Sequence, residues 1–271
     1  MSSIPTTFIF SFERPIYLWA TLDSLYRGTR SDMRFVLIDS GSRDPLVDQV
    51  IAGFNRRGML DEVVRVDRED TSWFGPFFEA RFGGLGEVFF SVESDVVIRE
   101  EPTCWAGRML GVMARDPRLA MLGSAVDKTD FPALEPVEAS LGRELSLGER
   151  KQLKLTSPER MMPQIGPDEV ASPFNPPGRL LALRTAAIAA HVVSWEQSTD
   201  IQMHRILREN GWTTGIYGGV IHRHLSLCNF FDYPAYSMAE RDIYMKGAAA
   251  AAEAAAAEAA QAAAEAAARG R

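Results

Sequence analysis

The sequence contains few cysteines and no long apolar run. Cys104 and Cys228 are its only two cysteines, and they lie far apart in the 271-residue chain. This spacing supplies no disulfide framework and is typical of a reducing compartment, so we expect a cytoplasmic protein. No stretch of about 20 apolar residues runs without a charge, and the first residues lack the basic segment and apolar core of a secretory signal. We therefore expect no transmembrane segment.

The sequence also lacks an excess of basic residues. It has 29 Lys and Arg against 36 Asp and Glu, which gives a net charge of -7. Because a protein that binds nucleic acid presents a broad basic surface, this charge argues against nucleic acid as a partner. The hydrophobic fraction of 46% is ample for a folded core.

Glycine is absent from the first predicted loop. Residues 7–11 (TFIFS) predict a buried strand, and Pro15 begins a helix with leucines on one face. Residues 12–14 connect the two. A dinucleotide-binding fold requires G-x-G-x-x-G at this place, and a sugar-phosphate nucleotidyltransferase requires a glycine-rich loop, so both alternatives lose support.

Strand and helix patterns alternate along most of the chain. Further strands are predicted at residues 34–38, 62–66, 88–92, 119–123, 179–183, 213–217 and 219–223, with helical patterns between most of them. This order predicts an α/β fold with a mostly parallel sheet flanked by helices. An irregular insert at residues 126–177 interrupts it, either as a functional lid that contacts a substrate or as an ordinary surface excursion.

Two polar turns follow predicted buried strands. The triplet Glu93-Ser94-Asp95 follows the strand at residues 88–92, and a turn that begins at Asp39 follows the strand at residues 34–38. In open α/β sheets ligands bind at the carboxyl ends of strands, and two carboxylates there can hold a hard divalent cation. Such a triplet is also common as a solvated turn or a helix N-cap.

The last third of the body holds three further candidate residues. Asp200 lies in the first turn of a predicted helix that Ser198 or Thr199 can cap, where an acidic residue also interacts with the helix dipole. His222 and His224 lie on the same side of a predicted strand, so both are candidate ligands. With Cys228 they also permit a zinc cluster, but a fourth ligand is not evident. Each histidine is otherwise an ordinary neutral imidazole.

Four ordered motifs resemble those of the GT-A nucleotide-sugar glycosyltransferases, most closely the large family 2 type. They are Ser11 with Arg14-Pro15, the turn Asp39-Ser40-Gly41-Ser42-Arg43-Asp44, the pair Ala80-Arg81, and the D-x-D-like triplet Glu93-Ser94-Asp95. The acidic residue Asp200, followed by His204-Arg205 and Gly211-Trp212, matches a fifth feature of that family. Two positions depart from its pattern, because Glu93 stands in place of Asp and Phe82 in place of a frequent Asn.

The resemblance implies a GT-A fold, a UDP- or GDP-sugar as donor and a hydroxyl group as acceptor. It assigns donor contacts to one group of residues, namely Ser11, Glu13, Arg14, Asp39, Arg81, Glu93, Ser94 and Asp95. It implies Mn²⁺ or Mg²⁺ held by Asp95 and Glu93 with His222 or His224, and mixed carboxylate and imidazole ligands favour Mn²⁺. Asp200 would act as the base of an inverting transfer.

The resemblance also predicts the domain organisation. We expect one glycosyltransferase domain at residues 1–246, with a nucleotide-sugar half at 1–125 and an acceptor half at 126–246. Residues 247–271 are almost pure Ala with spaced Glu, which predicts a helical or disordered tail whose alanine faces could form a weak homo-oligomer.

Two alternatives to a glycosyltransferase remain at the level of sequence. One is a sugar-phosphate nucleotidyltransferase, which would release pyrophosphate. The other is a catalytically silent module that binds a nucleotide sugar, suggested by the altered D-x-D-like triplet.

Overall fold

The computed structural model describes residues 4–127, 134–146, 149, 165–172 and 179–225. The chain divides into two compact units, of which the larger comprises Met1–Asp130 and Pro158–Ser226. The described part of the smaller unit contains helix α5 (Leu134–Leu141). The predicted tail at residues 247–271, most of the insert and Cys228 lie outside the described residues, so the domain limits stay a prediction.

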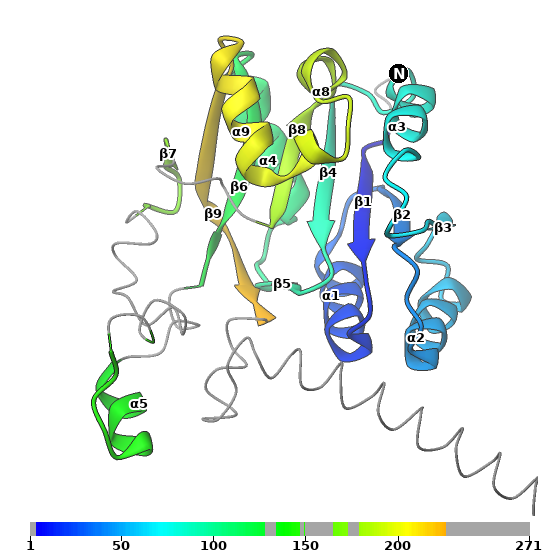
Figure 1. Cartoon of the computed structure of the whole chain (residues 1–271). Helices are drawn as coiled ribbons and strands as arrows, with labels where there is room; N and C mark the ends of the chain where they lie inside the picture. Colours follow the sequence, from blue (N-terminus) through cyan, green and yellow to red (C-terminus); the bar gives the residue numbers. More distant parts are fainter. Residues whose placement is uncertain (1–3, 128–133, 147–148, 150–164, 173–178, 226–271) are drawn as a thin grey trace, which may run out of the picture. The chain divides into compact units, whose positions relative to one another are not determined.

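The larger unit is built on a nine-stranded sheet (Figure 1). Its strands are β1 (Thr6–Ser11), β2 (Arg34–Asp39), β3 (Glu62–Arg65), β4 (Val88–Glu93), β5 (Val96–Ile98), β6 (Leu119–Val126), β7 (Val170–Ala171), β8 (Leu180–Arg184) and β9 (Thr213–His224). Their order is β3-β2-β1-β4-β8-β6-β9-β5, and β7 pairs with β9. Six strands (β1, β2, β3, β4, β6 and β9) run in one direction, and β5, β7 and β8 run in the other. The predicted mostly parallel α/β fold is confirmed.

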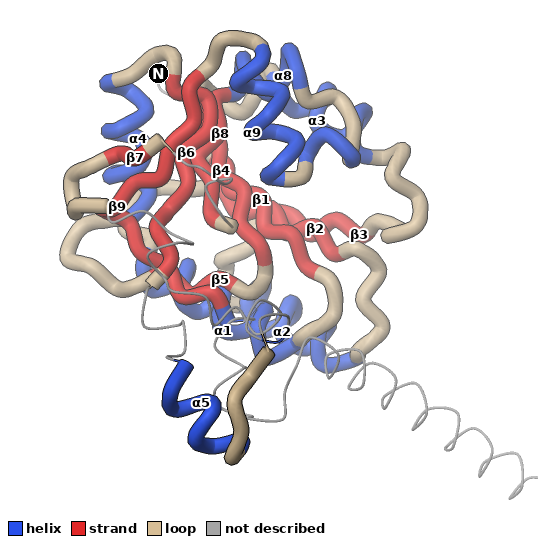
Figure 2. The backbone as a smooth tube through the Cα atoms, turned by 60° about the vertical axis from the view of Figure 1, so that its left-hand side comes forward, coloured by secondary structure: helices blue, strands red, loops and turns tan. Residues whose placement is uncertain are grey.

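Helices cover both faces of this sheet (Figure 2). One face carries α1 (Pro15–Gly28), α2 (Pro45–Arg56) and α4 (Trp105–Arg115), whereas the other carries α3 (Phe74–Phe82), α8 (Thr185–His191) and α9 (Asp200–Glu209), which a 3-10 turn (Glu196–Ser198) precedes. Among the described helices, none combines the length and the apolar character that crossing a bilayer requires.

The sequence signals that predicted these helices correspond to observed contacts. In α2 the Asp44 carboxylate accepts a hydrogen bond from Leu46 N, Pro45 occupies the first turn, and Val47 is buried. Gly58 follows the helix with φ 71°, a conformation that glycine adopts without steric cost. The helix therefore begins and ends where local chemistry favours it.

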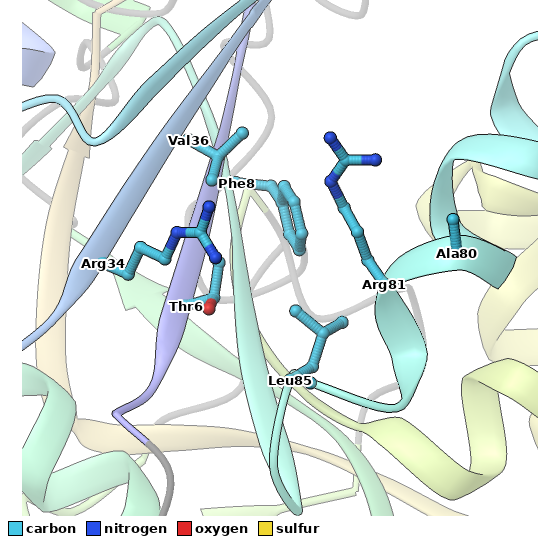
Figure 3. A pocket seen from close by; sticks show the side chains of 8 residues that line it. Thr6, Phe8, Arg34, Val36, Ala80, Arg81 and Leu85 are labelled. Carbon is cyan, nitrogen blue, oxygen red and sulfur yellow. The ribbon is translucent and has the colours of Figure 1, made fainter.

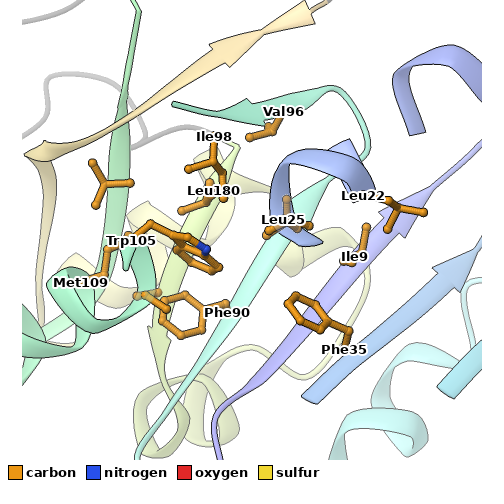
Figure 4. Close-up of a cluster of buried hydrophobic side chains, with 14 of the residues drawn as sticks. Ile9, Leu22, Leu25, Phe35, Phe90, Val96, Ile98, Trp105, Met109 and Leu180 are labelled. Atoms are coloured by element: carbon orange, nitrogen blue, oxygen red, sulfur yellow. The ribbon is translucent and has the colours of Figure 1, made fainter. Parts of the chain in front are cut away.

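Aromatic and aliphatic side chains fill the space between the sheet and the α1, α2 and α4 layer. Figure 4 shows Phe90 of β4 against Trp105 of α4, with ring centroids 4.8 Å apart. Ile9 of β1 and Leu22 of α1 belong to the same cluster and have no solvent exposure. This packing fixes the position of the central strands, whose carboxyl ends carry the polar residues described below.

The short strand β5, which the sequence pattern did not predict, is fixed on both sides. It pairs with β9 on one side, where Val96 lies opposite His224. On its other side two α1 hydroxyls accept its amides, because Val96 N donates to Thr21 Oγ1 and Ile98 N donates to Ser24 Oγ, both at 3.2 Å. Side chains of α1 thus accept the hydrogen bonds that the β5 amides would otherwise donate to a neighbouring strand.

Candidate functional site

The predicted polar turns meet at one edge of the sheet. The parallel register places Ser11 at the end of β1 opposite Asp39 of β2, and Phe10 opposite Glu93 of β4. The chain adds β2 and β3 on one side of β1 and then returns to place β4 on the other side. Ligands of open α/β sheets bind at such a reversal of strand order.

The loop between β1 and α1 has an unusual backbone. Glu13 and Arg14 have φ of 52° and 58°, and they are the two non-glycine residues of the described chain with positive φ. Left-handed geometry costs a residue with a side chain roughly 1–2 kcal/mol. Hydrogen bonds to the β2–α2 turn hold it, because the Glu13 carboxylate accepts from Arg43 N at 2.8 Å and Asp44 N at 3.0 Å. Glu13 N also donates to Ser42 Oγ at 2.8 Å.

Asp39 lies fully buried at the end of β2. Its carboxylate accepts from Ser42 N at 3.1 Å and from Arg65 Nη1 at 2.5 Å. Arg65 is its partner in the adjacent strand β3, and it also pairs with Asp48. Asp39 is therefore held in a fixed orientation beside the β1–α1 loop.

Asp95 is the most constrained acidic residue of the triplet. Its Oδ2 accepts from Arg14 Nη1 at 3.3 Å and lies 3.2 Å from His224 Nε2. Burial would raise the pKa of this carboxyl, but the hydrogen bond and charge of His224, together with Arg179 and Arg14, hold the pKa well below its usual range. Its other oxygen, Oδ1, is buried without a hydrogen-bond partner. Ser94 before it is also buried.

His222 lies fully buried on β9, two residues before His224. Its Nδ1 is 2.7 Å from Ser124 Oγ, and its Nε2 has no hydrogen-bond partner. Burial, helped by the charge of His224, lowers the pKa of His222 to about 3, so the imidazole is neutral near pH 7. A neutral imidazole with a free nitrogen is a competent metal ligand.

Three buried polar atoms without a hydrogen-bond partner thus belong to residues at or near the carboxyl ends of the strands. Ser11 Oγ, Asp95 Oδ1 and His222 Nε2 account for three of the five buried side-chain polar atoms without a partner in the described residues. Because buried polar groups normally find a partner, such a concentration points to a ligand-binding region.

Glu93 is oriented differently from Asp95. Its carboxylate forms an ion pair with Arg179 Nη1. Removal from bulk water raises the pKa of Glu93, although Arg179 opposes this shift. The sequence pattern predicted Arg179 only as the first residue of a strand and indicated no role for it in the site. No local pattern marks it, because it reaches Glu93 through the antiparallel pairing of β4 with β8, across 86 positions in the chain.

Asp200 begins α9, which Thr199 caps by accepting from Gln202 N. The segment before α9 lies over the end of β1, because the Trp195 ring is 6.4 Å from the ring of Phe10. The negative charge of Asp200 contributes, together with Glu93 and Asp95, to raising the pKa of Arg179 against the effect of burial. Asp200 therefore belongs electrostatically to the same group of charges.

Arg81 lies apart from this group. It lines a cavity of about 190 Å³ with Thr6 and Arg34, which begin β1 and β2, whereas Ser11 and Asp39 end them (Figure 3). Its guanidinium donates to Glu62 Oε1 at 2.6 Å and lies 3.7 Å from the centroid of the Phe77 ring. The placement of α3 thus gives no support to the expected donor contact through Arg81.

The side chains at the ends of β1, β4 and β9 include atoms of the kind that bind a divalent cation, but they do not form a complete set of ligands. Among the described residues, no group of three or more His, Cys, Asp or Glu side chains is arranged to hold a metal ion. Asp95 Oδ1 and His222 Nε2 nevertheless supply an unpartnered oxygen and nitrogen, a mixed set that suits Mn²⁺.

The described architecture is the GT-A fold of the nucleotide-sugar glycosyltransferases, as the motifs predicted. PcManGT, a mannosyltransferase from Pyrobaculum calidifontis solved with GDP-Man and Mn²⁺, aligns with a TM-score of 0.52 at 13% identity over 83% of this chain and 57% of that one. GalNAc-T7, solved with UDP, GalNAc and Mn²⁺, aligns with a TM-score of 0.52 at 13% identity over 82% and 44%. The chain thus spans about half the length of these proteins. No family model matches it, and no curated protein matches it in sequence.

Proposed function

We propose that this chain is a glycosyltransferase that moves a sugar from a nucleoside-diphosphate sugar to a hydroxyl acceptor. The observation that carries the proposal is the grouping of Ser11 Oγ, Asp95 Oδ1 and His222 Nε2, all buried and without partners, with the strand ends of a GT-A sheet. Two solved proteins of the same fold contain GDP-Man or UDP together with Mn²⁺.

The donor would bind across the ends of β1 and β2. Asp39 and the strained loop at Glu13 and Arg14 would recognise the nucleoside, because Ser42 connects this loop to the buried Asp39 carboxylate and so holds the two side by side. UDP- and GDP-sugars are the first candidates, since the two similar structures hold these nucleotides. Positions Ser11 and Ser94 would line the path towards the diphosphate.

Asp95 would hold a divalent cation, with His222 or His224 as a nitrogen ligand. A bound Mn²⁺ or Mg²⁺ supplies Lewis acidity at the diphosphate oxygens, which replaces protonation of the leaving group. Arg14 keeps Asp95 ionised and oriented, because its guanidinium contacts the carboxylate oxygen that also lies near His224.

Asp200 is the proposed general base of an inverting transfer. The acceptor hydroxyl would lose its proton to this carboxylate while its oxygen forms the new bond to the sugar on the face opposite the diphosphate. The sugar carries oxocarbenium-like charge in such a transition state, which nearby carboxylates stabilise. The position of Asp200 at the start of α9, which Thr199 caps, keeps it half-exposed and accessible to an acceptor.

Calorimetry tests this proposal directly. The protein is titrated with a panel of UDP-, GDP- and dTDP-sugars, first with Mn²⁺ and then with EDTA. Metal-dependent binding of one donor, followed by release of its nucleoside diphosphate when acceptors are added, would establish the reaction. A folded protein that binds none of these donors would refute it.

A second function is favoured by one observation, the ion pair of Glu93 with Arg179. Because this pair engages the first carboxylate of the triplet, the chain could bind a nucleotide sugar without turning it over. Donor binding without release of nucleoside diphosphate, under any acceptor tested, would distinguish this module from the enzyme. Release of pyrophosphate would instead indicate a nucleotidyltransferase.

A further inference from the structure

Arg179 and Glu93 are neighbours because of the sheet, not because of a flexible loop. Val92 lies opposite Leu180 in the antiparallel pair of β4 and β8, and Glu93 N donates to the carbonyl of Arg179 at 3.1 Å. This backbone bond extends the ladder by one step beyond the regular pairing. The two side chains therefore emerge together at the strand ends, where they form their ion pair.

The pair is accessible, in contrast to the acidic residue next to it. The side chains of Arg179 and Glu93 are 40% and 42% exposed, whereas that of Asp95 is 8% exposed. Both side chains are half-buried, so the pair is only partly removed from water, and a competing anion can replace one partner at a smaller cost than in a fully buried pair. Arg179 can thus exchange its carboxylate partner without disturbing the core.

The charges around Arg179 are mainly negative. Glu93, Asp95 and Asp200 all stabilise its protonated form. Three carboxylates would repel a diphosphate that enters this region. In the described residues, the Arg14 guanidinium also contacts one of them, Asp95. A protein cation near the diphosphate, in addition to the proposed metal ion, would balance the charge of the leaving group.

We propose that Arg179 binds the diphosphate of the donor and that Glu93 is the counter-ion which the diphosphate replaces, rather than a metal ligand. This inference rests on the proposed function. A guanidinium suits the role because it forms two parallel hydrogen bonds with phosphate oxygens and stays charged at all relevant pH values.

The role of Arg179 in the transfer step is electrostatic. The bond between the sugar and the β-phosphate oxygen breaks, and its electron pair remains on that oxygen as the acceptor oxygen bonds to the sugar. The acceptor proton passes to the base. Arg179 exchanges no proton, but it stabilises the negative charge that increases on the leaving diphosphate.

The test compares nucleoside diphosphates with monophosphates. Arg179→Met removes the charge and keeps most of the side-chain volume, so calorimetry should show about tenfold or greater weakening of UDP or GDP binding. UMP and GMP, which lack the β-phosphate, should lose much less. Arg34→Met is the matched control, because Arg34 pairs with Glu62 at the opposite end of the strands. The Arg34→Met variant should bind UDP or GDP with the affinity of the wild type.

Glu93→Gln provides the second arm. With EDTA present, removal of the counter-ion should tighten UDP or GDP binding, and this gain should disappear in the double variant Glu93→Gln with Arg179→Met. The double-mutant cycle isolates the coupling between the two residues from the general effect of removing a negative charge.

The outcomes separate this inference from the proposed function. If the wild type binds UDP or GDP and Arg179→Met lowers UDP and UMP affinity equally, or not at all, the inference is wrong and the proposed function stands. If Glu93→Gln abolishes Mn²⁺-dependent binding and has no effect in EDTA, Glu93 is a metal ligand and the inference is also wrong. A wild type that binds no nucleoside diphosphate refutes both.

Discussion

At the scale of single residues, the backbone strain at Glu13 and Arg14 accompanies the buried charges of the candidate site. Strain of this kind persists where the surrounding contacts over-determine a conformation, and here the Glu13 carboxylate supplies two of those contacts. It brings Arg14 to Asp95, 81 positions further along the chain. The strained loop thus orients the Asp95 carboxylate through Arg14, at a cost in local backbone stability.

Asp95→Asn should therefore lose metal-dependent donor binding. The amide keeps the shape of the side chain but removes the charge that Arg14 and His224 stabilise, and we expect roughly tenfold or greater weakening in calorimetry with Mn²⁺. Binding in EDTA should change much less. Glu79→Gln, an exposed change on α3, is the control and should leave both titrations unchanged. Unchanged Mn²⁺ dependence in Asp95→Asn would exclude this residue as a ligand.

Asp200→Asn should separate binding from transfer. Loss of a general base lowers turnover by roughly 10²–10⁴-fold, whereas the donor contacts lie at other residues. Calorimetry should give the wild-type donor affinity, and the release of nucleoside diphosphate in the presence of acceptor should fall. Wild-type turnover in this variant would show that the base lies elsewhere.

At the scale of elements, the attachment of β5 to α1 predicts a specific loss of stability. Thr21→Val removes the hydroxyl that accepts from Val96 N and leaves a buried amide without a partner, which costs about 1–3 kcal/mol of unfolding free energy. Thr21→Ser keeps the hydroxyl and should lose less. Denaturant unfolding measures both, and faster amide exchange at Val96 should accompany only the valine variant. Equal stability of the two variants would contradict the assigned hydrogen bond.

A second element-scale prediction concerns close backbone approach in β9. A Cβ added at Gly218 would stand 2.1 Å from the carbonyl oxygen of Gly166, so Gly218→Ala should destabilise the protein by about 1–3 kcal/mol. Gly53→Ala is the matched control, because nothing lies within 4 Å of the added Cβ and the position is inside α2. It should stabilise by about 0.5–1 kcal/mol. Thermal unfolding distinguishes the two, and an equally stable Gly218→Ala would disprove the close approach.

At the scale of the whole molecule, the order along the chain of most strands and helices could be predicted from local patterns, with the short strands β5 and β7 as exceptions. Apolar runs such as the one that became β4, and caps such as Thr199 of α9, have physical causes within a few neighbouring residues. The position of Arg179 beside Glu93 could not be predicted, because it depends on which strands pair. The contact of Arg81 with Glu62 could not be predicted either, because it depends on how α3 packs against β3.

The predicted domain limit at residue 246 can be tested on the same scale. All residues of the candidate site lie between Ser11 and His224, so a chain of residues 1–246 should bind the donor with the affinity of the full chain. Calorimetry on both forms gives this comparison, and gel filtration tests whether the alanine-rich tail promotes self-association. A large loss of affinity on truncation would show that the domain extends further.

The two α1 hydroxyls that receive the amides of β5 have a consequence for behaviour in concentrated solution. An open strand edge is a template for pairing with another chain and hence for aggregation. At one border of the sheet, Thr21 and Ser24 accept hydrogen bonds from the β5 amides that point away from β9. The opposite border is β3, which has only four residues. In the part of the chain that the structure describes, β5 and β7 pair with β9 at the first border, so neither border presents a long unpaired strand. The sheet is thereby protected against the edge-to-edge growth that initiates β-rich aggregates.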